Sequence, residues 1–117
     1  ARLMADANPL ESGSDEGGRW RRYFNSALEG RYATLTSAFE NLVFLQVPDL
    51  DAVRRWRLDQ EAERPPGQRL NAAQIEHFVA HYQRLTEWML EEVPRRAHVV
   101  VALAEDHRVM RVTVRDT

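Results

Sequence analysis

Residues 71–93 read NAAQIEHFVAHYQRLTEWMLEEV and carry the strongest structural signal in the chain. Its apolar side chains recur every three or four residues, which is the spacing of one face of an α-helix. This stripe comprises Ile75, Phe78, Val79, Tyr82, Leu85, Met89 and Val93. Asn71 and Gln74 resemble a capping box at the start of the helix. Pro94 is expected to break the helix, because proline lacks the backbone N–H that a further turn requires.

Short apolar segments on both sides of this helix predict strands. Residues 42–47 (LVFLQV) are apolar on both faces, as in a parallel strand buried between helices, and Pro48 ends them. Residues 99–103 (VVVAL) are a second apolar strand, and residues 109–114 follow as a hairpin partner or an edge strand. Two apolar strands joined by a long helical crossover predict an α/β layered fold. So few strands leave part of such a fold uncovered, and the sheet is expected to be incomplete.

The beginning of the chain is expected to be less regular. Residues 8–18 contain three of the five glycines and few apolar side chains, which predicts a loop or linker. From Arg19 the apolar residues follow helical spacing until Gly30, and a further helix is expected over 33–40. The chain is therefore divided into a linker, 1–18, and a folded part, 19–117.

Composition excludes several classes of function. The net charge of −2 provides no positive field to hold a nucleic acid. The longest apolar run, residues 99–104, is far shorter than the ~20 residues that cross a bilayer. There are no cysteines, which excludes disulfides and thiolate metal sites and agrees with a cytoplasmic location. His77 and His81 are one helical turn apart, but no third ligand is evident, so no metal site is predicted.

All sixteen basic residues are arginines, and several lie on a predicted helix, Leu50–Glu63, which starts with Asp49 or Asp51 as its cap. Without a lysine, the chain does not supply a nucleotide-binding P-loop. Guanidinium groups do suit bidentate contacts with phosphate, and residues 64–69 (RPPGQR) after the helix suggest a lid. The alternative is that these arginines form a solvated face paired with Asp59, Glu61 and Glu63.

Four segments occur in the order found in bacterial D-glycerate 3-kinase-like proteins. They are residues 18–25 (GRWRRYFN), 45–48 (LQVP), 56–61 (WRLDQE) and 78–86 (FVAHYQRLT). The chain thus resembles the C-terminal half of these P-loop kinases, which are related to uridine kinase, phosphoribulokinase and bacterial pantothenate kinase. The resemblance runs from about Asn8 to about Arg111. Residues 62–66 (AERPP) are shorter and more acidic than the family's lid.

This resemblance implies a partial three-layer P-loop kinase fold, with the C-terminal strands and lid helices only. It implies ATP and Mg²⁺ as cofactors of the complete enzyme, a glycerate-like hydroxy acid as acceptor, and a P-loop half located upstream. Arg57 and Arg64 would contact the transferred phosphate. The residues implied in substrate binding are Gln60, Glu61, His81, Tyr82 and Arg84.

The expected function is the C-terminal part of an ATP-dependent small-molecule kinase, a fragment or truncated gene product that is inactive alone. The first alternative is a catalytically inert binding or assembly module derived from such a kinase. It would cover its sheet by forming a homo-oligomer or by docking on a partner. The second alternative is a half that a separate nucleotide-binding half complements in trans.

Overall fold

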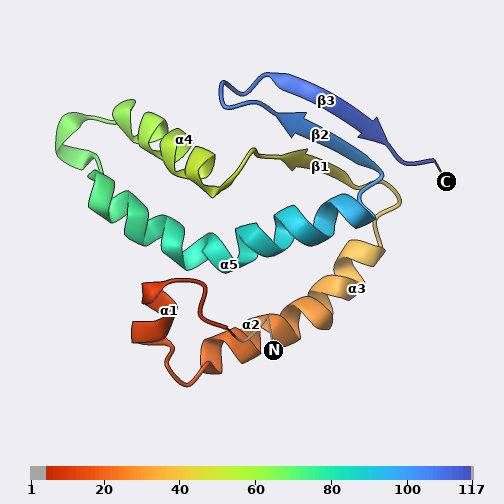
Figure 1. Cartoon of the computed structure of the whole chain (residues 1–117), viewed down its shortest axis with the longest axis horizontal. Coiled ribbons are helices and arrows are strands. Elements are labelled where there is room, and N and C mark those ends of the chain that lie inside the picture. The colour runs from red at the N-terminus through yellow and green to blue at the C-terminus, as the bar shows by residue number, and fades with distance from the viewer. Residues whose placement is uncertain (1–4, 117) are drawn as a thin grey trace. The chain divides into compact units, whose positions relative to one another are not determined.

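The computed structural model of the protein describes residues 5–116 and divides the chain into two compact units, Ala1–Asn41 and Leu42–Thr117 (Figure 1). The first unit contains α1 (Pro9–Ser14), α2 (Arg19–Glu29) and α3 (Arg31–Ser37). The second contains β1 (Val43–Gln46), α4 (Leu50–Ala62), the short 3₁₀ helix η2 (Pro66–Gln68), α5 (Ala72–Arg96), β2 (Val99–Leu103) and β3 (Val109–Val114).

The second unit contains a mixed three-stranded sheet in the order β1-β2-β3. β1 and β2 are parallel, with Val43 opposite Val99, and the α4–α5 hairpin connects them. β2 and β3 are antiparallel, with Val99 opposite Val114. The α/β class and the parallel pair predicted from the sequence are therefore confirmed. Of the two arrangements left open for residues 109–114, both hold, because β3 forms a hairpin with β2 and ends the strand order.

Helix α5 starts as predicted but ends later. The Asn71 side chain accepts from the Gln74 N–H at 2.8 Å, and the Gln74 side chain accepts from the Asn71 N–H at 2.9 Å, which completes the capping box. The expected break at Pro94 is wrong, because the helix continues to Arg96. Pro94 removes one backbone donor close to the end of the helix, and the Ala97 N–H still donates to the Val93 carbonyl at 2.8 Å. The chain becomes extended only at Ala97.

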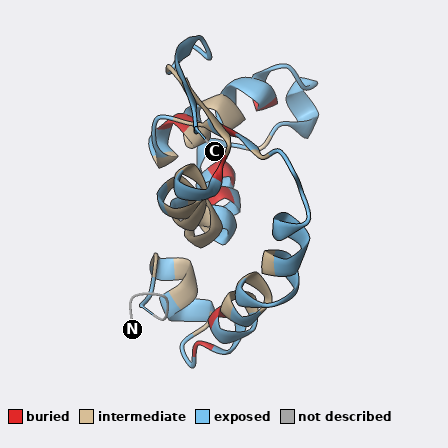
Figure 2. Cartoon of the chain, turned by 90° about the vertical axis from the view of Figure 1, so that its right-hand side faces the viewer, coloured by how far each residue is buried: buried red, intermediate tan, exposed pale blue. Residues whose placement is uncertain are grey.

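Only part of the apolar stripe of α5 is buried. Ile75 and Val79 are buried, whereas Phe78 and Tyr82 are exposed. The core is small, and Figure 2 shows how few residues are buried. Its apolar members are Phe44, Ala52, Ile75, Val79 and Ala97. One small core therefore positions the α4–α5 hairpin against the sheet.

The helices cover only one face of β1, so the prediction that β1 is buried on both faces is wrong. All residues of β3 are exposed. Phe44 is buried, whereas its neighbours Val43 and Leu45 are 56% and 60% exposed. The strand register continues their face across the sheet in two rows of aliphatic side chains. These rows are Val43, Val99 and Val114, and Leu45, Val101 and Val112. Within residues 42–116, the expectation of an incomplete sheet is met.

The first unit differs from its prediction in two places. Residues 8–18 were predicted as a loop, but Pro9–Ser14 form α1, because Asn8 caps the Glu11 N–H at 3.1 Å and Pro9 suits the first helical turn. The helix expected over 33–40 lies at Arg31–Ser37. Gly18, in front of α2, has a φ of 67°, a conformation that glycine adopts without steric cost.

Candidate functional site

The candidate site lies at the tip of the α4–α5 hairpin. Asp49 starts α4 by accepting from the Ala52 N–H at 2.7 Å, which decides between the two predicted caps. The helix ends at Ala62, one residue from the prediction. Residues 63–71 then lead through η2 to the start of α5, and the two helices pack against each other. Figure 1 shows this tip at the end of the hairpin away from the strands.

A buried carboxylate organises this tip. Glu61 is only 2% exposed. Its Oε1 lies 2.7 Å from Arg57 Nη1 and 3.3 Å from Arg64 Nη1, and its Oε2 accepts from the Leu70 N–H at 2.9 Å. The hydrogen bond from Leu70 lowers the pKa of Glu61, and the two guanidinium groups lower it further against the opposing effect of burial. Glu61 therefore carries its negative charge over the whole neutral range.

The two arginines are held in different ways. The Arg57 guanidinium lies 5.2 Å from the centre of the Phe78 ring, a cation–π arrangement, and Arg57 also donates to Gln60 Oε1 at 3.2 Å. Arg64 is more open, with 47% of its side chain exposed, against 22% for Arg57. The Arg64 carbonyl accepts from Arg69 Nε at 2.6 Å, which fixes the loop between the helices.

The predicted residues on α5 separate into two groups. Tyr82 lies beside Phe78, with ring centres 5.2 Å apart, and so joins the surface that begins at Arg57. His81 instead turns back along its own helix, where its Nδ1 lies 2.8 Å from the His77 carbonyl oxygen. Arg84 is partly buried. The structure thus brings Arg57, Gln60, Glu61 and Arg64 together, with Tyr82 next to them through Phe78.

Two participants at this site were missed by the sequence analysis. The sequence analysis placed Phe78 in the apolar stripe of the helix. In the structure Phe78 is exposed, and its ring lies under the Arg57 guanidinium. Leu70 contributes its backbone N–H, and a backbone group leaves no recognisable pattern of residues in the sequence. The alternative of a solvated arginine face paired with Asp59, Glu61 and Glu63 is met in part. Arg57 and Arg64 do pair with Glu61, but Glu61 is buried.

Other arginines of α4 support the hairpin. Arg54 pairs with Asp51 at 2.6 Å and with Glu76 of α5 at 3.0 Å. Arg55 pairs with Glu105 in the β2–β3 turn at 2.8 Å, and Trp56 Nε1 donates to the Glu105 carbonyl at 2.7 Å. These contacts tie α4 to α5 and to the β2–β3 turn.

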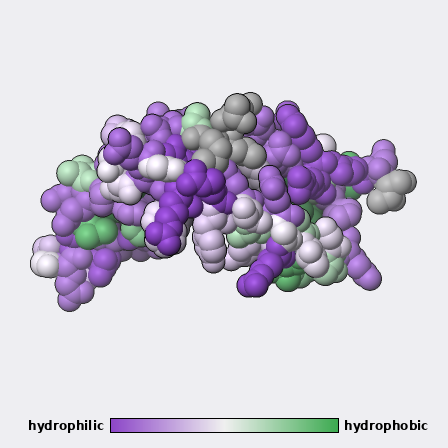
Figure 3. All heavy atoms as spheres, turned by 90° about the horizontal axis from the view of Figure 1, so that it is seen from below, coloured by the Kyte–Doolittle hydropathy of each residue, from purple (hydrophilic) through white to green (hydrophobic). Residues whose placement is uncertain are grey.

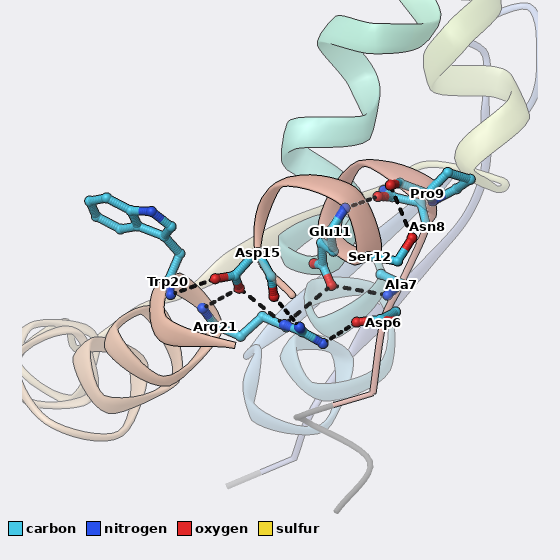
Figure 4. A network of polar contacts seen from close by, with 9 residues as sticks. All are labelled: Asp6, Ala7, Asn8, Pro9, Glu11, Ser12, Asp15, Trp20 and Arg21. Atoms are coloured by element: carbon cyan, nitrogen blue, oxygen red, sulfur yellow. Dashed lines mark hydrogen bonds and ion pairs between the residues drawn. The ribbon is translucent and has the colours of Figure 1, made fainter. Parts of the chain in front are cut away.

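A second polar cluster lies within the first unit (Figure 4). Arg21 is buried and pairs with Asp6 and with Asp15, the latter at 3.0 Å. The Asp15 carboxylate also accepts from the Trp20 and Arg21 N–H groups, at 3.0 and 3.1 Å. Burial raises the pKa of Asp15, but these hydrogen bonds and the Arg21 charge together bring it below its ordinary value. The cluster joins α1 to the start of α2 and serves the fold.

Surface composition adds little to the choice of site. In the view of Figure 3 hydrophilic residues predominate, and hydrophobic ones form smaller groups between them. Among the described residues, no group of three or more His, Cys, Asp or Glu side chains is placed to hold a metal ion. In the same part of the chain, no helix has both the length and the apolar composition of a membrane span.

Comparison with known proteins provides no relative. No protein-family model, no curated protein and no solved structure matches the chain.

Proposed function

We propose that this chain is the C-terminal part of an ATP-dependent small-molecule kinase similar to the D-glycerate 3-kinases, with the α4–α5 hairpin as its lid. The observation that carries the proposal is the cluster of Arg57 and Arg64 around Glu61 at the tip of that hairpin. A phosphoryl group that moves from ATP to a hydroxyl develops charge on its equatorial oxygens, and guanidinium groups offset this charge.

In this proposal, each part of the chain has a defined task. Arg57 and Arg64 approach the transferred phosphate when the lid closes and excludes water. Gln60 and Tyr82, on the same surface as Arg57, contribute to holding a glycerate-like hydroxy acid. The resemblance also implies His81 and Arg84 in this task, but His81 contacts its own helix instead. The upstream half of the complete enzyme supplies the P-loop lysine and binds ATP with Mg²⁺, which polarises the phosphates. The chain alone does not turn over, because it contains no lysine.

The sheet supports the same proposal. Parallel pairs joined by a helical crossover usually belong to sheets with helices on both faces. Here β1 and β2 are parallel, yet the face that carries Val43 and Leu45 is exposed, and among the described strands β1 has a neighbour on one side only. Further strands and helices from the upstream half would cover this face and extend the sheet past β1.

The exposed face also favours a second candidate function, an inert binding or assembly module. In that case, the aliphatic rows would be covered by a second copy or by another protein. The two candidates differ in one respect that can be measured, since only the kinase has a nucleotide-binding half.

The test begins with the intact mass of the protein isolated from its source. The kinase proposal expects a mass well above the 13.6 kDa of this chain, with a lysine-containing P-loop upstream. It also expects transfer of the γ-phosphate of ATP to D-glycerate, reduced about tenfold or more in Arg57→Ala, because a charge-assisted contact to the phosphate is lost. A natural protein of 117 residues that does not bind Mg-ATP would support the module instead.

A further inference from the structure

We propose that Glu61 is a positioning residue, which does not touch substrate but sets the direction of Arg57 and Arg64 toward one oxyanion. The inference rests on the proposed function, since it concerns the same lid. It replaces the substrate-binding role that the resemblance implied for Glu61. The oxyanion is a phosphoryl group or free inorganic phosphate, and the site can be tested without catalysis.

Burial is the first argument. At 2% exposure, the Glu61 carboxylate offers no surface to a substrate that arrives from solvent, whereas 22% of the Arg57 side chain and 47% of the Arg64 side chain remain exposed. The two arginines therefore present the accessible charge of the cluster. The carboxylate is behind them.

The anchoring of Glu61 is the second argument. Its Oε2 accepts from the Leu70 N–H, and Leu70 directly precedes Asn71, the cap of α5. One side chain near the end of α4 thus fixes the backbone at the start of α5 and closes the loop between them. A carboxylate held in this way cannot follow the arginines, so the arginines orient on it.

Convergence on one atom is the third argument. Arg57 Nη1 and Arg64 Nη1 both contact Glu61 Oε1, at 2.7 and 3.3 Å, so these nitrogens are no farther apart than the sum of those distances. Two oxygens of one phosphate can contact two guanidinium groups at such a spacing. Two positive charges against one negative charge leave the cluster attractive to an anion.

Glu92 provides a matched control on the same hairpin. It pairs with Arg95 and Arg96 at 3.4 and 3.8 Å, so it also has two arginine partners. Its side chain is 29% exposed. The comparison of Glu61 with Glu92 thus separates buried positioning from ordinary surface pairing.

The experiment uses the whole chain labelled with ¹⁵N and follows the Nε–Hε signals of the arginines by NMR. Inorganic phosphate is added at constant ionic strength to the wild type, Glu61→Gln and Glu92→Gln. Glutamine at position 61 keeps an oxygen that can accept from the Leu70 N–H but removes the charge that orients the arginines. Amide exchange at Leu70 reports whether the loop remains closed.

In the wild type, we expect restricted motion of Arg57 and Arg64 relative to Arg95, and a joint saturating response of both to phosphate. Glu61→Gln should mobilise both side chains and weaken the phosphate response roughly tenfold, the loss expected for one charge-assisted contact. Glu92→Gln should leave both unchanged. Equal or tighter phosphate binding by Glu61→Gln would overturn the inference, because the carboxylate would then compete with the anion.

The inference would also be overturned if Arg57 and Arg64 of the wild type showed no response to phosphate. It would equally be overturned if their side chains were as mobile as that of Arg95. None of these results decides whether a nucleotide-binding half exists. The kinase proposal and the role of Glu61 can therefore fail separately.

Discussion

Truncation of Ile75 is expected to destabilise the second unit severely. Ile75 is 1% exposed and lies in the first turn of α5. Among the described residues, it is the largest apolar side chain that is fully buried. Replacing a buried isoleucine by alanine costs about 2–5 kcal/mol, through lost transfer free energy and the cavity left behind. Because the apolar core contains only a few members, Ile75→Ala removes a large share of a total stability that is typically about 5–15 kcal/mol.

In a unit of this size, 1 kcal/mol corresponds to about 4–8 °C in Tm. A loss of about 3 kcal/mol therefore predicts a decrease of about 12–24 °C in Tm, measured by circular dichroism at 222 nm and checked by urea unfolding. Leu45→Ala is the control, since it removes an aliphatic side chain from the exposed face of the sheet and should cost less than about 1 kcal/mol. A decrease below about 4 °C for Ile75→Ala, or equal decreases for the two variants, would refute the assignment of the core.

Two further predictions concern polar groups. Asn71→Ala removes the capping box of α5 and should lower the free energy of unfolding in urea by about 1 kcal/mol. Asn71→Asp should retain most of the stabilisation, because aspartate also caps helices. An alanine variant as stable as the wild type would show that the cap contributes nothing. The pKa of Glu61 and that of Asp15 are both lowered on folding, so their stabilisation is present above their ordinary pKa and is lost as the pH falls through the folded value. The urea midpoint of unfolding should therefore decrease below about pH 4, and this decrease should be shallower in Glu61→Gln. If the midpoint of Glu61→Gln depended on pH as steeply as that of the wild type, the ionised Glu61 would not stabilise the fold.

Local signals account for the elements that the sequence predicted correctly. The spacing of apolar residues and the pair Asn71 and Gln74 define α5, and Asp49 defines the start of α4. Each of these signals acts within a few residues of the chain, so it is visible in one dimension. The signals for α1, the Asn8 cap and Pro9, are equally local, but the nearby glycines led to the prediction of a loop.

Contacts between distant residues account for what the sequence left open. The sequence contains Glu61 among many other carboxylates and Phe78 among many other apolar residues. Only the folded hairpin brings the Leu70 N–H to Glu61 and the Phe78 ring under Arg57. Likewise, the apolar letters of β1 do not distinguish the covered face from the exposed one.

Sequence patterns alone therefore predicted α2, α3, α4 and α5, the three strands and the α/β class, but took α1 for a loop. Burial of individual side chains, and the pairing of Arg57 and Arg64 with Glu61, became visible only in the folded chain. The physical reason is that secondary structure follows from the backbone and neighbouring residues, whereas burial and charge pairing depend on what other segments place beside a side chain.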